Sequence, residues 1–408
     1  CIRCQVERIA VIRSITKIVV TASILQMNLS AVRRVINLTF KYSVKEWNQM
    51  CKDTYVKFGY DYKDAVRYIT SACWEPIPAG GLEQNNLQNI IFLKPLDCLI
   101  KDKKFLKIKN FDELMQGYFD NLSLHLKDIE KKLDSIKWEK DPIISMTLES
   151  CNLRRMDISD GGGKYNNYGI LSVSLSNTVN ALLNIRELVF KQSKYSLMDV
   201  KNCCTGNYAK NEAINLFLKN SKKYFGFDDP DVLELINLIL EKTDSFVREY
   251  QNCFKGKIKF GLSSPSYIME SSVFPASFDG RKKGDPFAVH ISNENCNSFT
   301  ELLQFAACLD YSGSKMNGNV VDFFVSPQLV SENKDQFERL IKQGILNGVF
   351  QIQMNVIGSA KLIEARKNPE SFPNLIVRVW GFSAYFNDLP DDYKEYLIQR
   401  ALQSEHIA

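Results

Sequence analysis

The clearest periodic pattern in the sequence lies between residues 111 and 136. Apolar residues recur there at three- and four-residue spacing, which is the repeat of a helix that buries one face. They are Phe111, Leu114, Met115, Tyr118, Leu122, Leu126, Ile129 and Leu133. The same criterion predicts further helices at about 45–58, 62–70, 142–155, 175–191, 208–221, 230–253, 333–345 and 359–366. The chain is therefore expected to be rich in helices.

Three segments in the last third of the chain are predicted to be strands, and the last of them is short, apolar and β-branched. They are GNVVDFFVSP (318–327), GVFQIQMNVI (348–357) and LIVRV (375–379). A final helix is expected after Pro390, because acidic residues follow it in the first turn. Strands that alternate with helices indicate an α/β architecture. No repeat or low-complexity linker interrupts the pattern, so we expect one domain.

Composition is that of a globular protein and argues against two kinds of partner. The 408 residues are 45% hydrophobic and 24% charged. The net charge of +5 is spread along the chain, without a basic stripe with interleaved aromatic residues. The apolar run 18–25 is too short to span a bilayer. We expect neither a nucleic acid nor a membrane as partner.

The eleven cysteines indicate a reducing compartment, and so a cytoplasmic protein. They are irregularly spaced and too few for a disulfide scaffold at this length. Cys1 and Cys4 form a CxxC, but no second pair lies at zinc-ribbon spacing. His125, His290 and His406 have no metal-site or triad spacing. We expect no metal site.

Residues 1–44 remain unassigned by these patterns. The first 45 residues hold one acidic residue, Glu7, against several lysines and arginines, but no signal-peptide cleavage pattern. The sequence does not begin with methionine, so we expect a fragment whose edge is 1–44.

The strongest chemical signal is NLIVRVWGFSAYFNDLP (374–390). A backbone radical must be planar at Cα to delocalise into both flanking amides, and a Cβ would crowd that arrangement, so Gly381 suits it. The segment resembles the glycyl radical signature RVxGxSAxFxxL at Arg378, Val379, Gly381, Ser383, Ala384, Phe386 and Leu389. Bulky neighbours are expected to shield the radical from water and oxygen, namely Trp380, Phe382, Tyr385 and Phe386. The structural alternative is a glycine in a buried turn.

A second signal is ACWEPIPAGG (72–81), where prolines and glycines forbid a helix. In an extended loop, residues two apart point the same way, so Cys73 and Glu75 would face one substrate. This Cys-x-Glu-Pro resembles the loop of glycyl radical dehydratases and lyases such as glycerol dehydratase and choline trimethylamine-lyase. The structural alternative is a buried cysteine beside a surface glutamate.

The resemblance implies a relay of hydrogen atoms. The Cys73 thiol gives its hydrogen to the Gly381 radical, and the resulting thiyl takes a hydrogen from a substrate carbon. Glu75 acts as a general base on a neighbouring hydroxyl. The implied enzyme is an anaerobic lyase or dehydratase for a small polar substrate, such as a diol or a hydroxylated amine. An arylacetate decarboxylase is an enzymatic alternative.

The runner-up is a formate acetyltransferase resembling pyruvate formate-lyase, whose loop has two adjacent cysteines. Ala72 stands where the first would be, so acyl transfer lacks its nucleophile. Cys203 and Cys204 are adjacent but lie in a helical segment, which indicates packing. An alternative of another class is a non-catalytic remnant that binds a partner subunit or the activating enzyme.

Further segments resemble the family and extend the likeness over most of 45–408. They are GGGKYNNYGI (161–170), SFDGRKKGDPFA (277–288), KMNGNVVDFFVSP (315–327) and FQIQMNV (350–356). We interpret them as barrel framework, with a tight charged turn at Asp279, Gly280 and Arg281. Tyr165 is a candidate pocket residue or a core tyrosine. Departures at Ala72, Trp74, Trp380, Phe278 and 289–293 indicate a divergent pocket.

The fold implied by this resemblance is the C-terminal half of a ten-stranded α/β barrel. Residues 45–290 would form a catalytic barrel region with the thiyl loop, and 291–408 a glycyl radical region continuous with it. No cofactor is expected in the chain. A separate radical S-adenosylmethionine activating enzyme would install the radical at Gly381, and the family suggests a homodimer.

Overall fold

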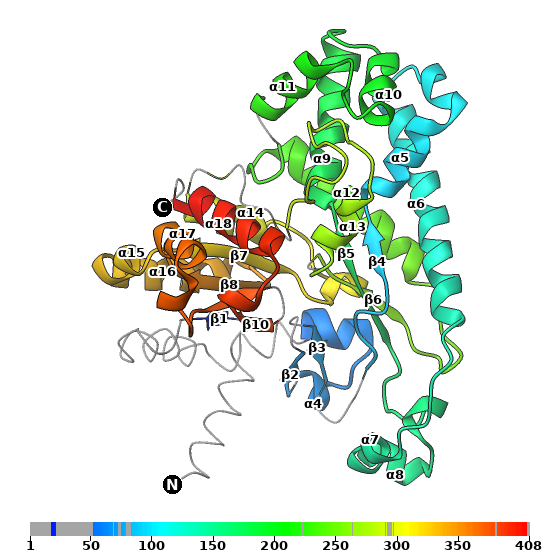
Figure 1. Ribbon diagram of the computed structural model, residues 1–408. Helices are drawn as coiled ribbons and strands as arrows, with labels where there is room; N and C mark the ends of the chain where they lie inside the picture. The colour runs from blue at the N-terminus through cyan, green and yellow to red at the C-terminus, as the bar shows by residue number, and fades with distance from the viewer. Residues whose placement is uncertain are drawn as a thin grey trace. The chain divides into compact units, whose positions relative to one another are not determined.

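Figure 1 shows the computed structural model of the chain. It describes residues 18–21 and 52–405, apart from 68, 72–74, 79–82, 222–223, 263, 290, 292–295, 297 and 380–381. The chain forms two compact units. Unit 1 takes Cys1–Ala79, Gly226–Asp228 and Cys296–Ala408, and unit 2 takes Gly80–Phe225 and Asp229–Asn295. The boundaries expected at 44 and 290 stay a prediction, since the units divide the chain at other points.

Unit 1 contains a parallel sheet of three strands in the order β1-β8-β7. The strands are β1 (Ile18–Thr21), β7 (Val320–Val325) and β8 (Gln351–Val356). Every residue of β7 and β8 is buried. This confirms the strands predicted within 318–327 and 348–357. Strand β1 lies in the segment that the sequence patterns left unassigned, because only its pairing with β8 identifies it.

Helices connect and cover this sheet. Parallel strands need a crossover, which α15 (Pro327–Glu332) and α16 (Lys334–Asn347) provide between β7 and β8. Helix α18 (Asp391–Glu405) packs along β7 and contacts α17 (Ser359–Lys367), as Figure 1 shows. Other helical segments of unit 1 are α14 (Phe299–Ala307), η5 (Gly313–Met316), η6 (Pro369–Ser371) and η7 (Phe386–Asp388). The helices predicted at 333–345, at 359–366 and after Pro390 are confirmed.

Two small antiparallel hairpins complete unit 1. They are β2 (Ile69–Thr70) with β3 (Pro76–Ile77), and β9 (Ile376–Val379) with β10 (Phe382–Tyr385). The helix predicted at 62–70 is wrong beyond its first half, because α4 covers only Tyr62–Ala65 and 69–70 pair with β3 instead. The described part of 45–58 is helical and contains a π-helix at Lys52–Val56, named η1.

Unit 2 contains a second parallel sheet in the order β4-β5-β6. The strands are β4 (Asn89–Ile91), β5 (Tyr168–Val173) and β6 (Ile258–Phe260). The long helix α6 (Phe111–Asp134) packs against α5 (Leu93–Lys101) and α12 (Pro230–Val247), and Figure 1 shows it alongside α5. Its periodic apolar residues are buried except Phe111, which is half-buried, so the strongest helix prediction is confirmed.

The other elements of unit 2 refine the predicted helices. They are η2 (Lys103–Lys107), α7 (Pro142–Thr147), α8 (Glu149–Arg154), η3 (Ile158–Asp160), α9 (Leu175–Ile185), η4 (Arg186–Lys191), α10 (Leu197–Thr205), α11 (Glu212–Asn220) and α13 (Tyr267–Ser272). The helix predicted at 142–155 is two helices, because Leu148 is extended. The predicted α/β class is confirmed by both sheets and the helices that connect their strands.

Candidate active site

The segment around Cys73 is a hairpin of unit 1. Ile69 pairs with Ile77 and Thr70 with Pro76. The Ser71 N–H donates to the Glu75 carbonyl at 2.9 Å. Residues 72–74, including Cys73, lie outside the described residues and form the three-residue connection between these partners. The expectation that this segment leaves the helical path is therefore confirmed at its two described ends.

Glu75, the residue at the exit of this connection, is completely buried. The three residues that follow it, 76–78, are buried as well. The alternative of a surface glutamate is therefore excluded. Buried carboxylates are rare, because leaving water costs a charged group much free energy. A carboxylate held in a dry environment two residues from Cys73 is suited to taking a proton from a bound substrate.

The segment around Gly381 is the second hairpin of unit 1. Val379 pairs with Phe382, Arg378 with Ser383 and Val377 with Ala384. Trp380 and Gly381 lie outside the described residues, and they form the two-residue connection between β9 and β10. Both reactive positions expected from the sequence thus belong to short connections of antiparallel hairpins, and both hairpins belong to the same compact unit.

The aromatic residues around Gly381 differ in exposure. Phe386 is completely buried, and its N–H donates to the Leu375 carbonyl at 2.7 Å. Phe382 and Tyr385 are each 46% exposed. Among the described residues β10 pairs with β9, and both rings are exposed in this chain, so the expectation that they shield the radical stays a prediction. Trp380 lies outside the described residues.

Arg378 is tied to β8 by side chains that the sequence patterns did not identify. Its Nε donates to Gln353 Oε1 at 3.2 Å. Its backbone N–H donates to Asn355 Oδ1 at 2.9 Å, and its carbonyl accepts from Asn355 Nδ2 at 3.1 Å. The alternation of polar and apolar residues in QIQMNV is visible in the sequence, but the burial of the polar residues and their partner on β9 are not.

A buried ion pair lies on the neighbouring strand. Arg400 Nη1 donates to Asp322 Oδ2 at 3.0 Å, and Nη2 donates to the Asp322 carbonyl at 2.9 Å. Both residues are buried, and burial raises the pKa of Asp322 although Arg400 opposes the shift. The pair fastens α18 to β7, the strand next to β8.

In unit 2 the charged turn expected at 279–281 is present. Gly280 has a φ of +94°, and the Ser277 N–H donates to the Arg281 carbonyl at 3.0 Å. The buried Asp279 carboxylate accepts from Ser277 Oγ at 2.6 Å and from Asn177 Nδ2 at 2.7 Å. This fully bonded turn supports the interpretation of the segment as framework.

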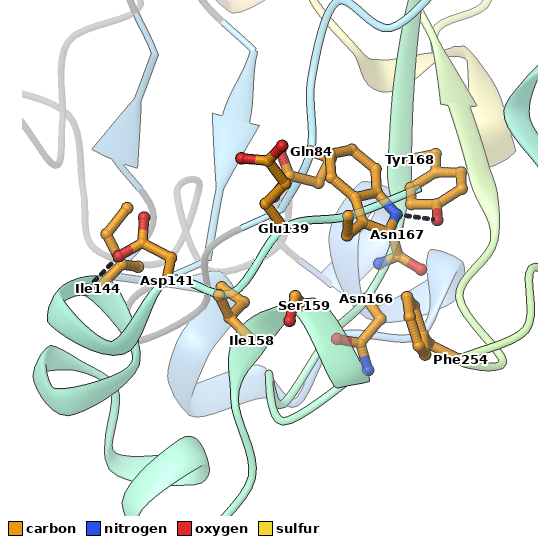
Figure 2. Close-up of a pocket in the computed structure, with 11 residues that line it drawn as sticks. Gln84, Glu139, Asp141, Ile144, Ile158, Ser159, Asn166, Asn167, Tyr168 and Phe254 are labelled. Atoms are coloured by element: carbon orange, nitrogen blue, oxygen red, sulfur yellow. Dashed lines mark hydrogen bonds between the residues drawn. The ribbon is translucent and has the colours of Figure 1, made fainter. Parts of the chain in front are cut away.

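Unit 2 also contains a cavity of about 170 Å³, drawn in Figure 2. Aromatic residues Trp138, Tyr168 and Phe254 line it, together with polar residues such as Asn166 and Asn167. The Trp138 Nε1–H donates to the Tyr168 hydroxyl at 3.0 Å, which is the dashed line at the right of the figure. Tyr165, the candidate pocket residue, is not among the lining residues of this cavity.

Two other groups considered in the sequence have structural roles. Cys203 and Cys204 are buried in α10, and burial raises the pKa of Cys203 to about 12, so this thiol stays protonated and the packing interpretation is confirmed. His125 Nε2 accepts the Ile91 N–H at 3.2 Å. In the part of the chain that the structure describes, no group of His, Cys, Asp and Glu is arranged to hold a metal. No described helix is long and apolar enough to cross a membrane.

Comparison with known proteins shows which family the chain resembles in sequence. The pyruvate formate lyase-like family matches residues 40–269, and the glycine radical family matches 289–387. The (2S)-3-sulfopropanediol dehydratase of Klebsiella oxytoca is 26% identical over 72% of this chain and 37% of its own length. The trans-4-hydroxy-L-proline dehydratase of Clostridioides difficile is 26% identical over 64% of this chain and 34% of its own length.

Solved structures agree with these matches. A Roseburia inulinivorans protein whose structure was described for 1,2-propanediol dehydration has a TM-score of 0.80 and 22% identity, over 86% of this chain and 48% of that one. The B12-independent glycerol dehydratase of Clostridium butyricum has a TM-score of 0.78 and 25% identity over the same shares. The chain thus has the α/β fold of these enzymes and spans about half the length of the solved relatives it matches. It belongs to the pyruvate formate lyase-like family of glycyl radical enzymes.

Proposed function

We propose that this chain carries the reactive half of a glycyl radical dehydratase or lyase. Gly381 stores the radical, Cys73 carries the hydrogen atom between Gly381 and the substrate, and Glu75 takes a proton from a substrate hydroxyl. The reaction is anaerobic cleavage of a C–O, C–N or related bond in a small polar molecule. Arg378, Ser383, Ala384 and Phe386 support the loop that holds the radical.

One observation carries this proposal. The Glu75 carboxylate is completely buried at the exit of the three-residue connection that contains Cys73. The hairpin that contains Gly381 belongs to the same compact unit. A buried acid beside a cysteine has little value for stability, because desolvation costs a carboxylate more than most partners return. It has value for catalysis, since a dry site strengthens proton transfer to a fixed base.

The names of the relatives support the substrate class. They include dehydratases of 3-sulfopropanediol and 4-hydroxyproline and an isethionate sulfite-lyase from Bilophila wadsworthia. Each name denotes loss of a group from a small polar molecule. An indoleacetate decarboxylase of Tractidigestivibacter scatoligenes is 23% identical over 72% of this chain, which keeps an arylacetate as the alternative substrate.

Acetyl transfer is the weaker enzymatic alternative. Position 72 is alanine, so the loop has one cysteine where formate acetyltransferases have two. The adjacent pair Cys203 and Cys204 cannot replace it, because both thiols are buried in α10 and burial raises the pKa of each. Formate release from pyruvate and coenzyme A would establish this alternative.

The proposal includes partners and a compartment. A radical S-adenosylmethionine enzyme installs the radical at Gly381, and the enzyme is a cytoplasmic homodimer that binds no further cofactor in this chain. No disulfide joins the cysteines that the structure describes, which supports a reducing compartment. The half-barrel expected from the family belongs to the same proposal.

The test is anaerobic activation of the full-length protein by an activating enzyme. We expect a glycine-centred electron paramagnetic resonance signal, and chain cleavage near Gly381 after exposure to air. Gly381→Ala should abolish both. Cys73→Ser should keep the signal and lose turnover on a panel of diols, hydroxyamines and arylacetates, and Glu75→Gln should keep the signal and slow turnover about 10²- to 10⁴-fold. A wild-type protein without either signal or cleavage is a non-catalytic remnant, and the proposal is then wrong.

A further inference from the structure

One face of β8 is polar although it is buried. Gln351, Gln353 and Asn355 alternate along the strand, so their side chains share a face. Asn355 and Gln353 are each only 1% exposed. A buried amide is costly unless its hydrogen bonds are made, so such a face needs partners on other elements.

The partners of Asn355 lie on β9. Its Oδ1 accepts the Arg378 N–H at 2.9 Å, and its Nδ2 donates to the Arg378 carbonyl at 3.1 Å. In the backbone pairing of the described residues, β9 bonds to β10 and is not part of the β1-β8-β7 sheet. A single side-chain amide therefore does what a pair of ladder hydrogen bonds does between neighbouring strands, since it presents one acceptor and one donor at backbone spacing.

Gln353 adds a third bond to the same residue. Its Oε1 accepts from Arg378 Nε at 3.2 Å. Gln353 is also the register partner of Asp322 on β7, whose carboxylate is bonded to Arg400 of α18. The backbone and the side chain of Arg378 are thus both held by β8, and β8 is in turn held in a sheet that α18 fastens.

The hydrogen bonds of Asn355 and Gln353 to Arg378, called the anchor below, lie close in sequence to Gly381. Arg378 precedes Gly381 by three residues in the sequence. Its register partner, Ser383, follows Gly381 by two residues, so the anchor acts on both arms of the hairpin. Hydrogen-atom transfer requires contact between donor and acceptor, and a displacement of 1 Å costs about 10²-fold in rate.

We propose that Asn355 is the positioning residue that sets the place of Gly381 against Cys73, with Gln353 in a supporting role. This rests on the proposed function, in which those two residues exchange a hydrogen atom. Asparagine suits the task for a specific reason. Aspartate would keep the acceptor for the Arg378 N–H but lose the donor to its carbonyl, and leucine of similar size would lose both.

The first experiment measures the anchor in the full-length protein before activation. Amide hydrogen exchange of peptides covering 376–385 should be about ten- to a hundredfold faster in Asn355→Leu, because two buried hydrogen bonds are lost. The exchange rate of the same peptides in Asn355→Asp should lie between the rates in Asn355→Leu and in the wild type. The matched control is Asn180→Leu, which removes a buried amide oxygen that accepts the N–H groups of Tyr224 and Phe225 in unit 2. It should leave the exchange of 376–385 unchanged.

The second experiment measures the relay in activated enzyme without substrate, in D₂O. The Gly381 radical takes deuterium from the Cys73 S–D, which leaves a thiyl and a Cα that carries one hydrogen and one deuterium. The thiyl then takes the hydrogen back, and the resulting S–H exchanges with solvent. The doublet splitting from the Cα hydrogen therefore collapses at a rate that reports contact between the two residues. Asn355→Leu should slow this collapse about 10²-fold per radical, and Asn180→Leu should not.

The outcomes are separable. Unchanged exchange of 376–385 and an unchanged rate of collapse in Asn355→Leu overturn the positioning role and leave the proposed function intact. A wild type that forms no glycine-centred radical overturns the proposed function, and amide exchange then decides alone whether Asn355 holds β9. Faster amide exchange together with a slower collapse, with partial recovery in Asn355→Asp, is the result that supports the proposal.

Discussion

The buried ion pair between Lys259 and Glu83 allows the sharpest stability prediction. Lys259 Nζ lies 2.5 Å from Glu83 Oε2, and neither side chain is exposed. Asn167 Nδ2 donates to the other carboxylate oxygen, Oε1, at 2.5 Å. Lys259 lies on β6, Asn167 directly precedes β5, and Glu83 is ten residues after Cys73 in the sequence. The pair therefore ties the segment at Glu83 to β6.

The perturbation is Lys259→Met, which keeps the volume and removes the charge. At 2.5 Å and an effective dielectric constant of about 20, the gross attraction is about 6–7 kcal/mol. The expected loss in free energy of unfolding is smaller than this attraction, because the variant no longer pays for desolvating the lysine. Removing one partner of a buried pair costs about 3–5 kcal/mol, most of it from the carboxylate left without its counter-charge. For a unit of roughly 200 residues this lowers Tm by about 6–20 °C.

The assay is thermal and urea unfolding followed by circular dichroism. Lys257→Met is the matched control, because this lysine is exposed and lies two residues earlier, and it should change the free energy of unfolding by no more than about 0.5 kcal/mol. The double variant Glu83→Gln with Lys259→Met should recover most of the loss, because no charge is then buried. A loss below about 1 kcal/mol for Lys259→Met would refute the reasoning, since a solvated pair costs that little.

Two further predictions concern unit 2. Burial, aided by Lys94, lowers the pKa of His125 from its ordinary value of 6.5 to about 4. The neutral imidazole therefore contributes about 3 kcal/mol to the free energy of unfolding, complete above pH 6.5 and lost as pH falls toward 4. Between those pH values, the free energy of unfolding should depend less on pH in His125→Gln than in the wild type. Gly280→Ala should cost about 1–3 kcal/mol, because φ is +94° and the new Cβ would lie 3.0 Å from the Lys219 backbone nitrogen.

A specific result would contradict each of the predictions for His125 and Gly280. Wild-type and His125→Gln proteins that lose stability in parallel from pH 7 to pH 4 would show that the imidazole is solvated. A Gly280→Ala protein that unfolds at the wild-type urea concentration would show that the turn at 279–281 relaxes without cost.

Local patterns predicted the elements whose structure depends on their own residues. Helix α6 was predicted closely, because an apolar repeat over 24 residues stabilises a helix whichever element covers it. Strand β7 was predicted from its mainly apolar sequence VVDFFV, and β8 from the alternation of polar and apolar residues in QIQMNV. The hairpin at 69–77 was predicted in part as helix, because two-residue strands are stabilised by their partner and not by their own propensity.

The polar face of β8 illustrates a second limit. Alternation of polar and apolar residues in QIQMNV is typical of a strand with one face in water. All six residues are buried, and Gln353 and Asn355 bond to Arg378, more than twenty residues away. Nothing near β8 in sequence indicates that partner, so the anchor was recognised only in the folded chain.

The sequence by itself indicated the family of this protein, through a glycine in a segment that resembles the radical signature and a cysteine two residues before a glutamate. That follows because the two motifs, around Cys73 and around Gly381, are each short and continuous in the sequence, so each can be recognised without the fold. Tertiary structure alone decided that Glu75 is buried, that the two hairpins share a unit, and that β9 is held by Asn355. Burial and hydrogen-bond partners come from segments far apart in the chain, and no local pattern records which of them will meet.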